Sequence, residues 1–445
     1  MRPKRTIVWL TLALSVLAVL GVPGAVPHGT SGAGLLEESE LEGRDEREPV
    51  SERAAIEVAF AAESYRAGSE ATLISFGDAT GVTLQMFRVG DGHGTLKRRD
   101  VMRGAAAAAL RYLGTLRNGQ HVTVKVPSAW PSGLYFAQLS TQGRAGYAPV
   151  VVVPRVLGRS PVAVVLPTET WQAYNFRDDD GDGLEDTWYA RPGVDTARLV
   201  RPFENRGVPP HYKYYDEPFL RWLARFHYQV DFLSDAELRT TSGAALRAAY
   251  RLLVFPGHHE YATVEEYGAV TEFRNRGGNL MFLSANNFFY KITIADGVMT
   301  RIGQWRKLGL PEAALEGVEY FAYDVQSRGG SPWKLTKSRP GRWIFSGTGL
   351  APGDTFSSGG IEVDHTGSAS PKGVAVLAEM HNVFGRPGQT AQMTFYATPN
   401  GAHVFAAGAF SLACSVWQRP VSRVVANLLL RLGGERGYVD VGAHT

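Results

Sequence analysis

The sequence predicts an α/β plus all-β protein, in which an Ig-like β-sandwich is followed by an α/β domain with a mostly parallel sheet. Three observations support this fold class. The chain has 445 residues, 44% of them hydrophobic, which is enough for two or three domains. Residues 55–155 contain short β-rich runs that partly alternate between apolar and polar side chains. From residue 156 onward, unbroken apolar runs alternate with helix-like segments, as in a parallel sheet that is buried on both faces.

The N-terminus has the pattern of an export signal. Basic residues precede an apolar run, 7–22, and small residues follow it. We therefore expect residues 1–25 to be a signal peptide or an N-terminal anchor, and residues 26–54 to be a flexible linker. The protein is then exported, and is either secreted or held on the extracytoplasmic side of a membrane through its N-terminus.

Charge and cysteine content exclude some classes of protein. Lys and Arg number 46 against 43 Asp and Glu, a formal net charge of +3, which argues against a nucleic-acid-binding protein. Cys414 is the single cysteine, so the chain has no internal disulfide. Its small, apolar neighbours predict a buried thiol with a packing role. A role as a thiol nucleophile is disfavoured, because the sequence shows no evident base beside it.

Within the β-rich region, the turn at 130–133 begins a hairpin that ends at Pro154. The alanine-rich segment 105–116 is predicted to be an inserted helix. In the second region, the sequence predicts strands that end at four positions, Thr168, Ser234, Gly257 and Ala285. The Gly- and aromatic-rich residues 291–370 are predicted to be an irregular insertion, after which strands return and an amphipathic helix, 420–434, ends the domain.

Polar and aromatic residues follow several of these strand ends. Because ligands bind at the carboxyl edge of an open α/β sheet, we expect the residues there to converge. They are Trp171, Tyr174, Asn175, His258, His259, Glu260, Asn286 and Asn287, joined by Tyr212, Tyr214 and Tyr215 from a segment just before a predicted helix. Packing at the rim of the sheet would account for the aromatic residues equally well. Phenolate and carboxylate oxygens, however, are hard donors that suit ferric iron, and a nearby histidine could transfer protons.

Five segments carry a resemblance to a known family. They are WPSGLYFAQL, TWQAYN, YYDEPFLRWL, PGHHEYAT and GGNLMFLSANNFFY. The chain resembles the large (beta) subunit of N,N-dimethylformamidase, an amide hydrolase with a mononuclear iron held by two tyrosines and a glutamate. The resemblance implies that Tyr174, Tyr215 and Glu260 are the iron ligands and that His258 is the active-site histidine. It also implies a polar residue near the metal, Asn286 or Asn287, and an α/β domain like that of the glutamine amidotransferases.

The segment RDDDGDGLEDTWY, residues 177–189, departs from that family, which has a short Gly-rich loop there. Asp178, Asp180 and Asp182 fit the start of a calcium-binding loop. The twelfth position of an EF-hand would be Tyr189 rather than glutamate, so a complete EF-hand is excluded. Glu185 or Asp186 could close a shorter loop, and a solvated acidic turn is the alternative.

The sequence therefore predicts an exported hydrolase that cleaves the C–N bond of a small-molecule amide other than dimethylformamide, with ferric iron and, as a second metal, calcium. His258 and Asn287 are the predicted catalytic residues. The alternative is a non-catalytic cell-surface protein that binds a glycan or a peptide on the same fold. A serine or cysteine hydrolase is disfavoured, since the chain has no G-x-S-x-G motif and the turn at 257–260 carries no Ser or Cys. Structural roles are expected for His211, His227, His365, His381 and His403, and an oligomer is compatible with the sequence.

Overall fold

The computed structural model describes residues 47, 50, 54–90, 98–190, 193–324, 331–410 and 412–435. The predicted signal or anchor, 1–25, and nearly all of the predicted linker lie outside these residues. The chain divides into two compact units, Met1–Ser39 and Glu40–Thr445, and the second contains every described residue. Among the helices that the structure describes, none is both long and apolar enough to cross a membrane.

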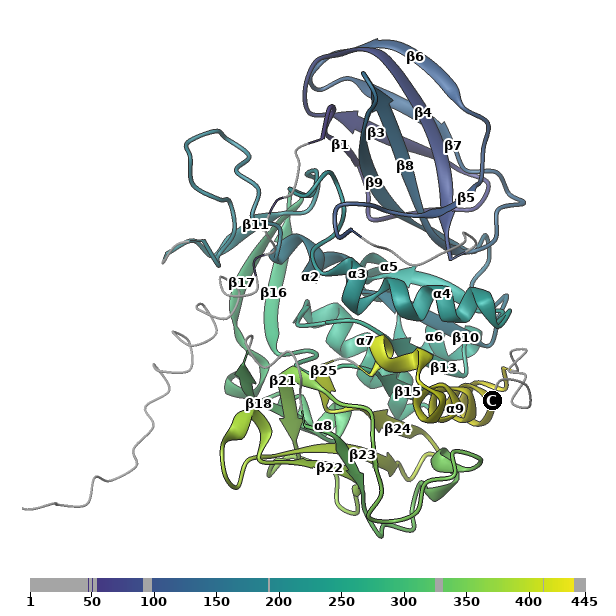
Figure 1. Cartoon of the computed structure of the whole chain (residues 1–445), viewed down its shortest axis with the longest axis vertical. Helices are drawn as coiled ribbons and strands as arrows, with labels where there is room; N and C mark the ends of the chain where they lie inside the picture. Colours follow the sequence, from purple (N-terminus) through teal and green to yellow (C-terminus); the bar gives the residue numbers. More distant parts are fainter. Residues whose placement is uncertain are drawn as a thin grey trace, which may run out of the picture. The chain divides into compact units, whose positions relative to one another are not determined.

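The first part of this unit is a pair of β-sheets that enclose one hydrophobic core (Figure 1). One sheet has the order β1 (Val58–Phe60), β3 (Glu70–Ser75), β7 (His121–Lys125). The other runs β2 (Ser64–Arg66), β9 (Arg144–Val153), β8 (Gly133–Thr141), β4 (Ala79–Val89), β5 (Gly104–Ala106), with β6 (Arg111–Leu116) also paired to β4. Buried and exposed residues alternate along β3 and β7, as expected of strands with one face in a core. The predicted all-β region is therefore present, while its Ig-like character stays a prediction.

The helix predicted at 105–116 is wrong, because this segment forms β5 and β6 at the side of β4. Alanines favour a helix locally, but pairing with a long strand overrides that preference. Strands β4 and β5 lie close together at Gly104, where an added Cβ would lie 2.1 Å from the carbonyl oxygen of Arg88.

The α/β part is built on a sheet of nine strands. Their order is β12 (Asp231–Ser234), β10 (Val162–Leu166), β13 (Leu252–Phe255), β15 (Asn279–Phe282), β24 (His403–Ala406), β23 (Thr390–Ala397), β22 (Ala375–His381), β19 (Trp333–Leu335) and β20 (Thr355–Phe356). Neighbours are parallel from β12 to β24 and antiparallel from β24 to β20. The prediction of a mostly parallel sheet thus holds for one half of it, and the likeness to glutamine amidotransferases stays a prediction.

Short helices connect the parallel strands (Figure 1). They are α2 (Thr168–Ala173), α3 (Tyr212–Tyr215), α4 (Glu217–Arg225), α5 (Asp235–Thr240), α6 (Gly243–Ala249) and α7 (Val264–Asn275), and α8 (Ala313–Glu316) and α9 (Arg419–Leu428) come later. Helix α7 begins with a capping box, in which Thr263 and Glu266 bond to each other's backbone N–H. One-turn 3₁₀ segments lie at Trp305–Leu308, Arg342–Phe345, Val383–Gly385 and Ala413–Trp417, and a π-turn, Leu429–Gly433, follows α9.

The region predicted to be irregular, 291–370, contains ordered strands. Strands β16 (Tyr290–Ala295) and β17 (Val298–Gln304) form a sheet with β11 (Thr196–Arg198) and β14 (Tyr261–Ala262). Strands β18 (Glu319–Asp324) and β21 (Gly360–His365) form another with β25 (Ala409–Phe410). Register shifts interrupt the pairing of β16 with β17 and of β18 with β21, so the alternation that would have marked them as strands is irregular in the sequence.

Candidate functional site

Tyr174 and Glu260 meet where two neighbouring parallel strands end. Tyr174 caps α2, which follows β10 directly, and Glu260 follows the turn after β13. The Tyr174 hydroxyl donates a hydrogen bond of 2.7 Å to Oε2 of Glu260, and both side chains are buried. The predicted convergence of these two residues at the carboxyl edge of the sheet is therefore present in the structure.

Tyr215 reaches the same place from α3. It lines a cavity of about 20 Å³ together with Tyr174, His258 and His211. The His211 ring stacks on Tyr215 with centroids 5.0 Å apart, so His211 belongs to the wall of the site rather than to a distant structural position. A cavity of this size has room for about one water-sized particle.

Asp216 is a further wall residue of this cavity. Its Oδ2 accepts a hydrogen bond of 3.2 Å from Nε1 of Trp171, whereas its buried Oδ1 has no hydrogen-bond partner among the described residues. An added Cβ on Gly257 would lie 2.6 Å from this Oδ1, so the turn after β13 needs glycine to lie against Asp216. Asp216 was not among the residues predicted from the sequence to lie at this site.

His258 lies between two carboxylates. Its Nε2 is 3.6 Å from Oε2 of Glu260 and 3.2 Å from Oε2 of Glu362, which is fully buried on β21. Burial lowers the pKa of His258 well below its usual value, and His211 and His259 lower it further, so the imidazole is neutral near pH 7. Sequence reasoning missed Glu362, because it lies in the segment predicted to be irregular and carries no motif.

Two more phenols surround Glu260. The Tyr189 hydroxyl donates to Oε2 of Glu260 at 3.1 Å and is also hydrogen-bonded to the Tyr261 hydroxyl, which accepts from Nε1 of Trp188 at 3.1 Å. Burial raises the pKa of Glu260 to about 7, although the hydrogen bonds from Tyr174 and Tyr189 lower it. The adjacency of Tyr261 to Glu260 was the one sequence signal for this cluster.

The two asparagines support the turn that carries the site. Asn287 Oδ1 accepts a hydrogen bond of 3.3 Å from the backbone N–H of His259, and its Nδ2 donates to Glu316 at 3.3 Å. Asn286 donates its backbone N–H to Oδ1 of Asp364 at 3.0 Å and adopts a positive φ of 52°. The hydrogen bonds of Asn287 therefore position the backbone of the turn, and its predicted catalytic role stays a prediction.

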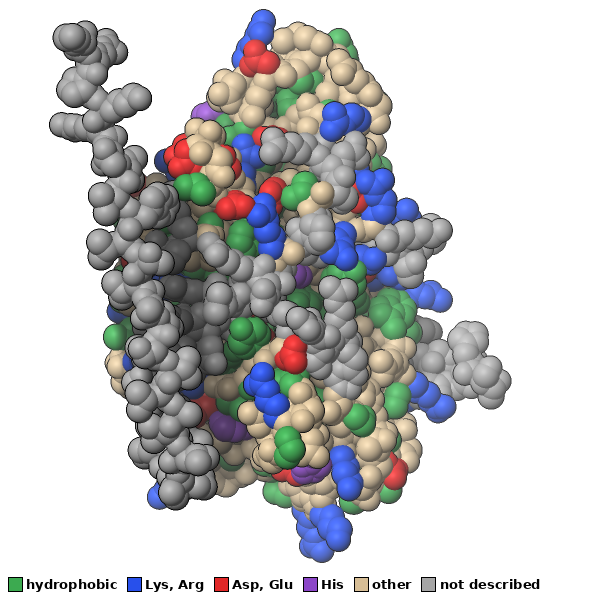
Figure 2. Space-filling view, turned by 60° about the vertical axis from the view of Figure 1, so that its left-hand side comes forward, with side chains coloured by type: hydrophobic (Ala, Val, Ile, Leu, Met, Phe, Trp, Pro, Cys, Tyr) green, Lys and Arg blue, Asp and Glu red, His purple; other side chains and the backbone are tan. Residues whose placement is uncertain are grey.

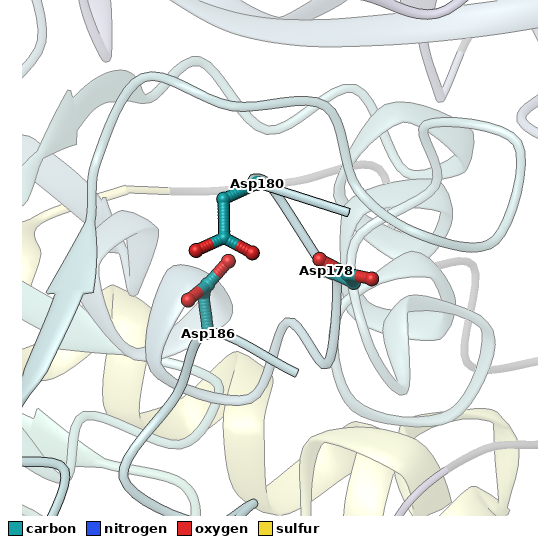
Figure 3. A group of neighbouring side chains, drawn as sticks. All are labelled: Asp178, Asp180 and Asp186. Atoms are coloured by element: carbon teal, nitrogen blue, oxygen red, sulfur yellow. The ribbon is translucent and has the colours of Figure 1, made fainter. Parts of the chain in front are cut away.

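The acidic segment brings together a different trio from the one predicted. Asp178, Asp180 and Asp186 offer carboxylate oxygens that lie within 4.8 Å of one another (Figure 3). Asp182 is not part of this group, and its Oδ1 accepts from the backbone N–H of Leu184 at 2.8 Å. Of the two residues that could close a shorter loop, Asp186 belongs to this group, whereas Glu185 is paired with Arg47. Calcium binding at this loop stays a prediction.

The remaining candidates have packing roles or lie at the surface. Cys414 is half-buried rather than buried, and its thiol contacts the carbonyl oxygen of Tyr214. His365 stacks on Phe321 at 4.2 Å, and His403 stacks on Phe395 at 5.6 Å. On the face shown in Figure 2, basic and acidic side chains are scattered among neutral ones.

Comparisons with known proteins add a family to this geometry. No curated protein matches the chain. Among solved structures, an uncharacterized protein from Bacillus anthracis str. Ames matches with a TM-score of 0.16 and 12% identity, over 21% of this chain and 78% of that one. A cycloisomaltooligosaccharide glucanotransferase from Paenibacillus sp. matches with a TM-score of 0.17 and 11% identity, over 56% of this chain and 34% of that one. Neither likeness is close enough to carry an argument. The family model described as N,N-dimethylformamidase beta subunit-like, C-terminal, matches residues 83–418, and the chain belongs to this family.

Proposed function

We propose that the protein is a metal-dependent hydrolase of an amide C–N bond, with a mononuclear ferric iron held by Tyr174, Tyr215 and Glu260. The observation that carries this proposal is the 2.7 Å contact between Tyr174 and Glu260 beside a small cavity that Tyr174 and Tyr215 line. Membership of the dimethylformamidase family supports an amide hydrolase.

The residues present fit an iron ion. Two phenols and a carboxyl are hard oxygen donors, which suit ferric iron better than zinc. The buried Oδ1 of Asp216, which has no hydrogen-bond partner among the described residues, also lies in the wall of this cavity and favours an ion or a bound water there. Iron in this place would polarise the amide carbonyl and lower the pKa of a bound water.

The protein side chains supply proton transfer and orientation. His258 is neutral and buried, so it can accept a proton from an attacking water and return it to the leaving amine. Oε2 of Glu362 lies 3.2 Å from Nε2 of His258, close enough to stabilise the imidazolium that forms when the ring accepts a proton. The side chains of His258, Glu260 and Glu362 are buried, which limits their contact with bulk water.

The substrate of this proposal is a small-molecule amide other than dimethylformamide, and the protein acts outside the cytoplasm. The basic and apolar pattern of residues 1–25 supports export. The small volume of the cavity supports a compact acyl or amine group at the metal.

Iron content tests the proposal directly. We expect about one iron per chain after iron-replete expression, with a visible absorption band from phenolate-to-iron charge transfer. Tyr174→Phe and Glu260→Gln should lower the iron content strongly, while Tyr267→Phe, which removes a buried phenol that bonds to Pro311, should not. A colourless, iron-free wild-type protein would overturn the iron site and favour the alternative, a non-catalytic cell-surface protein that binds a glycan or peptide.

A further inference from the structure

The acidic segment 177–189 ends at the proposed metal site. Tyr189, its last residue, donates to the same carboxylate oxygen of Glu260 that accepts from Tyr174, at 3.1 Å and 2.7 Å respectively. The rings of the two tyrosines stack with centroids 4.6 Å apart. The segment that departs from the dimethylformamidase pattern therefore delivers a second hydrogen bond to a proposed iron ligand.

Arg201 fixes this segment to the end of α2, which carries Tyr174. Its buried guanidinium donates to the carbonyl oxygens of Gln172 at 2.8 Å, Asn175 at 2.9 Å and Asp186 at 2.9 Å. It also donates to Oδ2 of Asp179 at 3.2 Å. Both ends of the segment are thus held by one cation.

The residues that precede Tyr189 add further ties. The Thr187 hydroxyl donates to the carbonyl oxygen of Ala173 at 2.5 Å, one residue before Tyr174. Trp188 donates to the Tyr261 hydroxyl at 3.1 Å, and Tyr261 is in turn hydrogen-bonded to Tyr189. The position of the Tyr189 hydroxyl relative to Tyr174 and Glu260 is therefore determined by several independent hydrogen bonds.

We propose that Tyr189 is a positioning residue of the metal site, which holds the Glu260 carboxylate in place and sets how strongly it binds iron. This inference rests on the proposed function, because it needs iron at Glu260. A hydrogen bond to a ligand carboxylate fixes its orientation and withdraws electron density from it. Removing a residue that hydrogen-bonds to a metal ligand typically lowers metal affinity about 10- to 100-fold.

Tyr189→Phe tests the inference, with Tyr267→Phe as the matched loss of a buried phenol elsewhere. We expect Tyr189→Phe to fold with a cooperative thermal transition and to bind iron about 10-fold or more weakly in a chelator competition. Its charge-transfer band should move to shorter wavelength, because the freed carboxylate donates more charge to the iron, and its intensity per iron should stay unchanged. Tyr267→Phe should alter neither iron affinity nor the band.

Three results would contradict this role. An unchanged affinity and band would mean that Tyr189 only fills space. If the charge-transfer band lost about one third of its intensity per iron, the iron would have gone from three phenolate ligands to two, and Tyr189 would itself be a ligand. A wild-type protein without iron would overturn the proposed function and this inference together. If Tyr189→Phe fails to fold, Trp188→Phe removes the donor at the far end of the three hydrogen bonds Trp188–Tyr261, Tyr261–Tyr189 and Tyr189–Glu260, and a smaller shift in the same direction is expected. An unshifted band would then overturn the role.

Discussion

Nε2 of His258 lies 3.2 Å from Oε2 of Glu362, although His258 is in the turn after β13, Glu362 is on β21, and the two residues are 104 positions apart (362 − 258). Both side chains are buried, so the carboxylate acts on the imidazole without competition from bulk water. Glu362 therefore places a carboxylate beside the imidazole, where it can stabilise a protonated ring, and it lies on a strand that no motif in the sequence marks.

Glu362→Gln should lower the rate of amide hydrolysis by about 10- to 100-fold while the iron content stays the same, because the histidine loses the neighbouring carboxylate that stabilises its protonated form. The measurement is amine release from a panel of short amides, with iron determined on the same sample. Glu379→Gln is the matched control, since Glu379 lies 3.5 Å from the exposed His381. Equal rates for wild type and Glu362→Gln would show that the contact has no role in turnover.

Gly257→Ala should destabilise the fold by about 1–3 kcal/mol, because the new methyl group would lie 2.6 Å from Oδ1 of Asp216 in a closely packed turn. Gly268→Ala in α7 provides the comparison, since a Cβ there meets nothing within 4 Å and alanine favours a helix by about 1 kcal/mol. Denaturant unfolding of both variants should therefore give changes of opposite sign. A Gly257→Ala protein as stable as wild type would mean that Asp216 can move aside freely.

The parallel half of the sheet could be predicted because its strands are buried on both faces and read as unbroken apolar runs. Strands β10, β13 and β15 are of this kind, and the first two are neighbours. Their adjacency explains why Tyr174 and Glu260 could be expected to meet from strand ends alone. Tyr215 could not be placed in this way, because α3 precedes a helix rather than following a strand, and only the family resemblance singled it out.

The antiparallel parts of the site could not be predicted, for physical reasons. Glu362 reaches His258 through β21, whose pairing with β18 has a register shift that breaks the period of two. Tyr189 was noted only as the residue that fails to complete an EF-hand, and its contact with Glu260 depends on long-range hydrogen bonds of Arg201. For segment 105–116 the sequence signal is misleading rather than absent. Its strong local preference for a helix is overridden by pairing with β4.

Asp364→Asn should change how stability depends on pH. Burial raises the pKa of Asp364 to about 7, and Glu312 adds to this, while the N–H of Asn286 opposes it. The unfolded pKa is about 3.9, so between about pH 4 and 7 the folded state binds more protons than the unfolded state. The unfolding free energy contributed by Asp364 therefore falls as pH rises through this range, by at most about 1.4 kcal/mol per pH unit.

Urea unfolding at several pH values between 4.5 and 7.5 checks this dependence. The wild-type protein should lose stability relative to Asp364→Asn as the pH rises, because asparagine cannot ionise. The difference between the two proteins should level off above about pH 7. A constant difference across the range would show that Asp364 ionises at the same pH in both states.

Calcium binding by the acidic segment can be tested residue by residue. The carboxylates of Asp178, Asp180 and Asp186 lie within 4.8 Å of one another, and Asp182 is not among them. If the predicted site exists, Asp186→Asn should abolish calcium binding in a calorimetric titration, whereas Asp182→Asn should weaken it less. The expected dissociation constant is about 10⁻⁴ to 10⁻³ M, as for extracellular calcium modules. Wild-type protein that shows no heat at millimolar calcium would identify the segment as a solvated acidic turn. Its contact with Glu260 through Tyr189 would then be maintained without a metal ion, by the hydrogen bonds of Arg201, Thr187 and Trp188.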